Sequence, residues 1–349
     1  MRFLLLALAL ALTTLHAEKA SKPFLSSDRR AFTAPELLDA PDEWIIRSFA
    51  WADDMFNTYP PAVPEHPARR AALIRLDDVL HITSAPQKPL VHKFFHEQVT
   101  RGIEDLERTK LTAGARIWKI YSHSWIVRTP SVTIAFDLVP GPPRNDAFSL
   151  PTTLLERIVR QADVLFISHL HSDHANKVVA KMFLEQGKPV VAPEGLWKDD
   201  AYFASRLTYP ERSADKVHSL AKPSLKYVAY PGHQGKAPIN NNHLVITPEN
   251  FAVMQTGDES SDDNDWSDFA WINNVGFQHT VDVLLPNCWT TDIKRMARGV
   301  NPKLILTGHE NEMGHTVDHR EDYTQTYNHL FGSPYPFIVM SWGEGYTVR

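Results

Sequence analysis

One short segment of the chain places several metal-binding side chains directly after a buried strand. Residues 164–167 form an apolar run of strand length, and residues 169–174, with the sequence HLHSDH, follow it almost at once. Imidazole nitrogens and carboxylate oxygens are common protein ligands of divalent transition metals. A fold that carries this segment must bring three histidines and an aspartate to one strand end. We therefore expect a metal site there.

The spacing within this segment suits two metal ions. His169 and His171 point the same way from an extended chain, so both imidazoles can bind one ion. Asp173 and His174 lie where the chain turns toward a helix and can reach a second ion nearby. The alternative is a surface histidine cluster without an ion. Four metal-binding residues at fixed spacing favour the metal site.

The pattern His-x-His-x-Asp-His after a buried strand resembles the signature of the metallo-β-lactamase superfamily. The resemblance implies an α/β (α+β) fold, a four-layer αββα sandwich with the metals at one edge of the two sheets. It also implies a third His after a later strand, a Gly-Asp at a strand end and a last His near the C-terminus. The chain has all three after apolar, strand-like runs, at His233, Gly257-Asp258 and His309.

The resemblance further implies how seven ligands divide between two ions. The first ion is bound by His169, His171 and His233, the second by Asp173, His174 and His309, and Asp258 bridges the two. We prefer His309 to His315 as the last ligand because it lies nearer the strand end. His315 then becomes a candidate for contact with substrate or with a ligand, although a solvated structural role is equally open.

Residues 120–127 and 132–137 predict a hairpin of two alternating strands, with His123 in the first and Asp137 at the end of the second. This hairpin resembles the opening of the branch that contains ascorbate-6-phosphate lactonase and N-acylphosphatidylethanolamine phospholipase D. Ser122 stands where that branch usually has Gly, and Leu138 where it usually has Pro. By resemblance His123 and Asp137 orient ligands from behind, although a core histidine bonded to the backbone is an equal alternative.

Two divalent cations that share a water lower its pKa toward about 7, which provides a hydroxide at neutral pH. In the mechanism that we expect, Asp173 accepts a hydrogen bond from this hydroxide while it acts as a ligand, and Asp258 bridges the ions. The many histidines favour zinc, and manganese or iron also fits the mixed donors. The expected activity is a hydrolase.

The expected substrate is a small molecule with a phosphodiester, lactone or ester bond. A true β-lactamase is disfavoured because that group as a rule lacks an Asp at position 258. Two alternatives stay open. One is a mononuclear-iron enzyme like the persulfide dioxygenases, which also keep His at position 171, and the other is a periplasmic metal-binding protein without activity.

The N-terminus has the pattern of a cleavable signal peptide. Arg2 precedes ten apolar residues, 3–12, and Ala17 offers a small residue at the cut. We therefore expect a periplasmic or secreted protein with residues 1–17 removed. No later segment approaches the ~20 apolar residues of a membrane span, so none is expected in the mature protein. Cys288 is the sole cysteine, which excludes an internal disulfide, and we expect it to be buried.

The mature chain divides into two predicted parts. Residues 18–111 form a helical N-terminal extension, and residues 112–349 form the catalytic domain. Helical periodicity is clearest at Val91, Phe94, Phe95, Val99, Ile103 and Leu106. Four prolines within residues 60–67 divide the extension into at least two helical pieces.

The net charge and the distribution of acidic residues limit the kinds of partner that we expect. The net charge is −5 for the whole chain and −6 without the predicted signal peptide, because that peptide holds one Arg and no acid. A nuclease would need a basic groove, so nucleic acid is not an expected partner. The acidic run 259–268 lacks the pattern of a calcium loop, and we expect it to face solvent. The sequence leaves the oligomeric state open.

Overall fold

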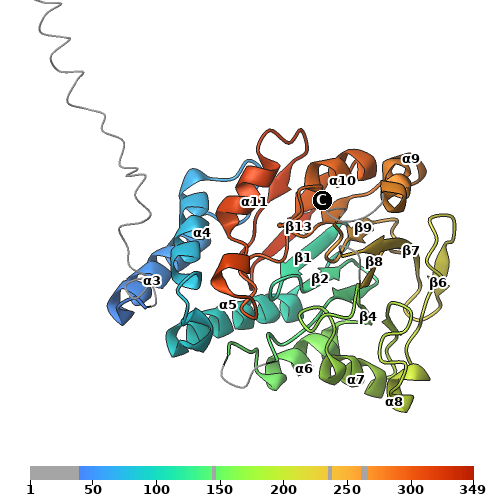
Figure 1. The fold of residues 1–349 in the computed structure, drawn as a ribbon, viewed down its shortest axis with the longest axis horizontal. Coiled ribbons are helices and arrows are strands. Elements are labelled where there is room, and N and C mark those ends of the chain that lie inside the picture. The colour runs from blue at the N-terminus through green and yellow to red at the C-terminus, as the bar shows by residue number, and fades with distance from the viewer. Residues whose placement is uncertain (1–38, 144–146, 235–237, 261–265) are drawn as a thin grey trace, which may run out of the picture. The chain divides into compact units, whose positions relative to one another are not determined.

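The computed structural model describes residues 39–143, 147–234, 238–260 and 266–349. The predicted signal peptide, residues 1–17, lies outside this part of the chain. Ala40–Arg349 form one compact unit, so the helices before residue 111 and the sheets after it belong together (Figure 1). No helix within the described ranges is both long and apolar enough to cross a membrane.

Helices precede the sheets, as the periodicity predicts. They are α3 (Asp42–Thr58), α4 (Pro67–Leu80), the short η1 (Ala85–Gln87) and α5 (Pro89–Arg108). Pro67 and Pro89 occupy the first turns of α4 and α5, where a missing N–H costs no helical hydrogen bond. All six apolar positions predicted for the buried face of α5 are buried. This face packs in one core with residues of the first sheet.

The following elements form two sheets. The first has the order β13-β1-β2-β3-β4-β5, and the second has the order β12-β11-β10-β9-β8-β7-β6. The first sheet contains β13 (Gly345–Val348), β1 (Ala115–Lys119), β2 (Trp125–Arg128), β3 (Thr133–Phe136), β4 (Val164–Phe166) and β5 (Val190–Val191). The second contains β12 (Phe337–Ile338), β11 (Leu304–Leu306), β10 (Val283–Leu285), β9 (Ala252–Gln255), β8 (Ile239–Ile246), β7 (Leu225–His233) and β6 (His218–Leu220).

Parallel pairing concentrates strand ends at one edge of each sheet. Strands β3, β4 and β5 are mutually parallel in the first sheet, as are β9 to β12 in the second. The connecting segments contain α6 (Thr152–Gln161), α7 (Lys177–Glu185), α8 (Ala201–Ala204), η2 (Trp266–Asn274), α9 (Val275–Gln278), α10 (Ile293–Val300), η3 (Val317–His319) and α11 (Tyr323–Leu330). The chain segments that follow β4, β9 and β11 carry the candidate ligands.

Three apolar cores separate four layers. Alternate side chains of each strand face opposite sides, so Ile117 and Val127 of the first sheet pack against the second sheet. Trp118 and Ile126 face the other way, into the core shared with α3 to α7. A third core lies between the second sheet and α9, α10 and α11, and Leu330 is part of it. The αββα arrangement follows from this division, and Figure 1 shows the helices outside the sheets.

The predicted hairpin forms, because β2 pairs antiparallel with β3, but its first strand begins later than predicted. Strand β2 begins at Trp125, and His123 lies in a tight turn between β1 and β2, closed by a hydrogen bond from Ser124 N to Tyr121 O of 2.7 Å. Ser122 has φ +47°, a conformation that costs little only for Gly. This strained turn explains why a Gly suits the position, and it moves His123 out of the sheet.

The prediction that the acidic run 259–268 faces solvent is wrong at its first residue. Glu259 is buried and accepts hydrogen bonds from the side-chain amides of Asn240 and Asn242. Ser260 is buried as well. Residues 261–265 lie outside the described residues. Cys288 is buried, as predicted.

Candidate metal centre

The HLHSDH segment forms a compact turn between β4 and α7. The backbone N–H groups of His174 and Ala175 both donate to His171 O, at 3.0 and 2.8 Å. The side chain of Asn176 then accepts from the backbone N–H groups of Val178 and Val179, which caps α7. The turn therefore closes within a few residues, and its histidines lie at the carboxyl end of β4.

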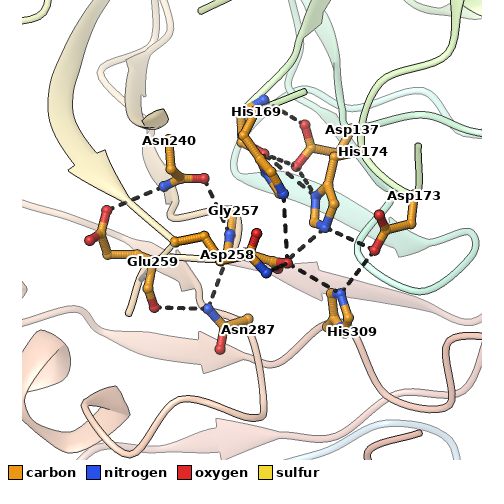
Figure 2. A network of polar contacts seen from close by, with 12 residues as sticks. Asp137, His169, Asp173, His174, Asn240, Gly257, Asp258, Glu259, Asn287 and His309 are labelled. Atoms are coloured by element: carbon orange, nitrogen blue, oxygen red, sulfur yellow. Dashed lines mark hydrogen bonds and ion pairs between the residues drawn. The ribbon is translucent and has the colours of Figure 1, made fainter. Parts of the chain in front are cut away.

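Asp258 lies on a second turn, after β9. Gly257 has φ +51°, and a Cβ there would come within 2.5 Å of the Ser168 side chain. Asn287 holds this turn through hydrogen bonds from its amide to Gly257 O and Glu259 O, each 3.1 Å (Figure 2). Asn240 accepts from Asp258 N at 3.3 Å. The carboxylate of Asp258 is thereby fixed toward the first turn.

His309 comes from a third segment, after β11. Its backbone has φ +81°, and its N–H donates to Ser122 O at 3.0 Å. Gly308 precedes it because a Cβ there would lie 2.2 Å from Nδ1 of His123. His123 therefore fills the space behind the segment, with its ring centre 5.7 Å from that of His174 and 6.4 Å from that of His309.

Four candidate ligands form one tight group. Nε2 of His174 lies 3.3 Å from Asp173 Oδ2 and 3.2 Å from Asp258 Oδ1. Nε2 of His309 lies 3.1 Å from Asp173 Oδ2 and 3.5 Å from Asp258 Oδ2 (Figure 2). Ligands at about 2.1 Å from a tetrahedral zinc ion are about 3.4 Å apart. The distances in this group therefore suit a shared cation.

A second group contains His169, His171 and Asp258, whose ligand atoms lie within 4.8 Å of one another. Nε2 of His169 lies 3.7 Å from Asp258 Oδ2. Asp258 thus belongs to both groups, which is the geometry of a bridging carboxylate. The structure brings together six of the seven predicted ligands in these two groups.

His233 does not join either group among the described residues. It ends β7, and its backbone N–H donates to Glu259 Oε1 at 3.3 Å. The next residue, Gln234, donates its side-chain amide to Asp258 Oδ2 at 3.0 Å. The assignment of His233 to the first ion therefore stays a prediction.

Asp137 holds two of the candidate ligands by hydrogen bonds, His174 directly and His169 through Ser168. It is fully buried, and its Oδ2 accepts from His174 Nδ1 at 2.9 Å and from Ser168 Oγ at 2.7 Å. Because the Ser168 hydroxyl donates to Asp137, its oxygen is left to accept from His169 Nδ1 at 3.0 Å. Both imidazoles therefore carry their proton on Nδ1 and direct the Nε2 lone pair into the group.

Several of the candidate ligand atoms lack any hydrogen-bond partner. Nε2 of His169, Nε2 of His174 and Oδ1 of Asp258 are buried and unpartnered within the described part of the chain. Nε2 of His174 and Oδ1 of Asp258 lie 3.2 Å apart without hydrogen-bond geometry. Buried polar atoms normally have partners, and a cation between them would supply one. The residues fit a metal ion.

The charges of the candidate ligands also favour a bound cation. Burial alone would lower the pKa of His174 and His309, but the carboxylate of Asp258 raises both well above their usual range. His169 is also buried, which lowers its pKa to about 3 and keeps it neutral. The carboxylates therefore attract positive charge, which protons supply in the absence of a metal.

A cavity of about 460 Å³ opens beside the group. Its lining residues are Gln234, Asp258, Trp289, His309, Gly314, His315, Thr316, His319 and Glu321. Glu321 lies 3.5 Å from Nδ1 of His309 and 3.7 Å from Nδ1 of His315. No sequence pattern points to Glu321 or Gln234, because neither belongs to a ligand motif and their positions beside the group depend on contacts between distant segments. His315, a sequence candidate, lies beside His309 in this cavity wall.

No family model matches the chain, and no curated protein matches it by sequence. Solved structures match it in fold. Igni18, a metallo hydrolase from Ignicoccus hospitalis, has 16% identity over 68% of this chain and 99% of its own, with a TM-score of 0.54. A possible metal-dependent hydrolase from Veillonella parvula has 14% identity over 68% and 100%, with a TM-score of 0.51.

A third match is the metallo-β-lactamase fold protein YhfI from Bacillus subtilis, with 12% identity over 66% of this chain and 99% of its own and a TM-score of 0.46. Identities this low show a shared fold alone. The narrower resemblance to the lactonase and phospholipase D branch stays a prediction. The fold prediction is confirmed in its architecture: the chain has a four-layer αββα sandwich and shares its fold with Igni18 and the Veillonella parvula protein.

Proposed function

We propose that the protein is a metal-dependent hydrolase that holds two divalent ions, most simply zinc. The observation that carries the proposal is the position of Asp258, which belongs to both groups of candidate ligands. His169 and His171 would hold one ion, with His233 as its predicted third ligand, Asp173, His174 and His309 would hold the other, and Asp258 would bridge the two. Bound divalent ions acidify a shared water and polarise a carbonyl or phosphoryl oxygen.

The chain's own residues then have distinct tasks. Asp173 is the more open carboxylate, with 12% of its side chain exposed against 2% for Asp258. Asp173 would accept a hydrogen bond from the metal-bound water while it acts as a ligand, and Asp258, which lines the cavity, would bridge the two ions. Asp137 keeps the Nε2 lone pairs of His169 and His174 available, because it holds their protons on Nδ1 directly or through Ser168.

The proposed substrate is a small molecule with a phosphodiester, lactone or ester bond. Its support is the set of polar side chains in the cavity wall, where His319 and Gln234 can donate hydrogen bonds to a phosphoryl or carbonyl oxygen and His315 lies beside His309. No Ser or Cys nucleophile is needed by this mechanism. The open cavity would admit a small molecule beside Asp258 and His309.

The test combines metal content with turnover. We expect about two zinc or manganese ions per chain, and hydrolysis of bis-p-nitrophenyl phosphate or a simple lactone in preference to nitrocefin. His171→Ala should abolish metal-dependent hydrolysis because it removes one of the three candidate ligands in the first group. Retained turnover in the purified, metal-assayed variant would refute the mechanism. One iron per chain with oxygen consumption would instead indicate a dioxygenase.

We also propose that the chain is exported. The support is the sequence of residues 1–17, a short apolar stretch that ends in a small residue. Expression of the whole chain in a bacterium should yield a periplasmic or secreted product whose N-terminus begins near residue 18, as intact-mass measurement would show. An uncleaved product retained in the cytoplasm would contradict the proposal.

A further inference from the structure

Glu321 lies between two imidazoles that face different ways. Its Oε2 is 3.5 Å from Nδ1 of His309 and 3.7 Å from Nδ1 of His315. Oε2 of Glu321 and Nδ1 of His309 are both buried and have no hydrogen-bond partner within the described ranges. The ion-pair distance is longer than a strong hydrogen bond, but each atom is the other's available partner. A small rotation of either side chain would close it.

The backbone around Glu321 is held in place by other parts of the fold. Its carbonyl accepts from Asn311 N at 2.7 Å, which closes the loop that begins after His309. The preceding residue, Arg320, is buried, and its guanidinium donates to the backbone carbonyl of Leu80. The side chain of Glu321 is therefore presented from a fixed loop.

The carboxylate of Glu321 is placed to hold a proton on Nδ1 of His309. Nε2 of the same ring lies 3.1 Å from Asp173 Oδ2, in a hydrogen bond whose proton a metal ion would replace, and its lone pair would then face the ion. A carboxylate behind a ligating histidine orients its ring and raises its basicity as a ligand. Asp137 does the same for His174, so the two histidines of this group have equivalent supports on opposite sides.

The other imidazole turns toward the cavity. Nδ1 of His315 lies 3.0 Å from the backbone carbonyl oxygen of His319, which can only accept, so Nδ1 carries a proton. Its Nε2 is then the nitrogen left for the cavity that His315 lines. The ring centres of His309 and His315 are 5.4 Å apart. A substrate held at His315 would therefore lie beside the candidate metal group.

We infer that Glu321 is a positioning residue that orients His309 toward the metal and, together with the carbonyl oxygen of His319, holds His315 at the cavity. The inference rests on the proposed function and extends it to a residue outside the ligand set. The three side chains could also be considered as a further metal site, because their ligand atoms lie within 4.8 Å of one another. That arrangement would require His309 to bind ions through both nitrogens, and the positioning role needs no such bridge.

The test compares Glu321→Ala with Asp318→Asn, a control on the same loop whose side chain is 78% exposed. Zinc Kd is measured by chelator competition on the whole protein, together with the visible spectrum of the cobalt-substituted protein. Glu321→Ala should raise the Kd of the ion bound at His309 about 10- to 100-fold and change the cobalt spectrum. Asp318→Asn should leave both unchanged.

A second variant separates the two tasks of Glu321. His315→Ala should leave zinc Kd and the cobalt spectrum unchanged and raise KM for the best substrate of the panel. If Glu321 were only structural, Glu321→Ala would lower the Tm of the metal-free protein and leave the Kd and spectrum of the folded fraction intact. That result, or a third bound ion that is lost with Glu321, would overturn the inference.

The number of bound ions distinguishes failure of the proposed function from failure of this inference. A wild-type protein that binds fewer than two ions overturns the proposed function, and the inference with it. Two ions bound equally well by wild type and by Glu321→Ala overturn the inference alone.

Discussion

Two segments deliver ligands to the same candidate metal group, and they are held in different ways. The turn at residues 169–174 is fixed locally, by hydrogen bonds to His171 O and by the Asn176 cap of α7. The loop at residues 309–321 has little regular structure of its own. It is fixed by α4, which lies more than two hundred residues earlier in the chain.

The contact between α4 and this loop is a buried polar cluster. The carboxylate of Asp77 accepts from Asn311 Nδ2 at 3.1 Å, from Tyr323 N at 2.9 Å and from Thr324 N at 3.2 Å. Arg320 donates to the carbonyls that follow, at Leu80 and Ile82. The helical N-terminal part therefore supports the loop that carries His309. The position of this candidate ligand depends on contacts with residues that lie far away in the sequence.

The largest expected effect is on the support of the local turn. Asp137→Ala would leave Ser168, His174 and Gln255 without the buried carboxylate to which they donate. Loss of one partner in a buried charged network costs about 3–5 kcal/mol. We expect that loss in urea unfolding of the metal-free protein, together with loss of metal measured by mass spectrometry. A variant with wild-type stability and metal content would show that the turn needs no support from β3.

A smaller effect is expected at the remote support. Asp77→Ala should lower the free energy of unfolding by about 1–3 kcal/mol, because it leaves the N–H groups of Tyr323 and Thr324 unpaired. The ion at His309 should bind more weakly, whereas the group of His169 and His171 should keep its affinity. Calorimetric titration with zinc resolves the two sites. Equal weakening of both ions would mean that the two segments are not supported independently.

The smallest expected effect is a pH dependence of the remote support. Burial raises the pKa of Asp77 to about 7, with a contribution from nearby Asp322 and against the hydrogen bonds from Tyr323 N and Asn311. The folded state therefore favours the protonated acid. Its contribution to stability is complete below the unfolded pKa near 3.8 and is lost as the pH rises through about 7.

The comparison with Asp77→Asn isolates this titration. Between pH 6 and pH 8 the metal-free wild type should lose about 1 kcal/mol of stability relative to Asp77→Asn, which does not titrate. Denaturant unfolding at several pH values measures the difference. A constant difference across this range would show that Asp77 stays ionised in the fold.

Sequence reasoning succeeded where a local pattern had a single physical meaning. The apolar run before His169 and the helical period of α5 each follow from side-chain spacing. It failed where the backbone was strained or the partner was remote. His123 was expected in a strand but lies in a turn with Ser122 at φ +47°, and Glu259 was expected in solvent but is buried on Asn240 and Asn242.

The sequence by itself determined where strands and helices are expected and which side chains could bind metal, because periodicity and ligand type are local properties; the αββα fold was implied by the resemblance of the ligand pattern to a known superfamily. Only the tertiary structure decided which of those side chains meet. It brought Asp258 into both ligand groups and placed Glu321 behind His309. The physical reason is that distances between segments far apart in the chain are set by the packing of sheets and helices, and no local pattern encodes them.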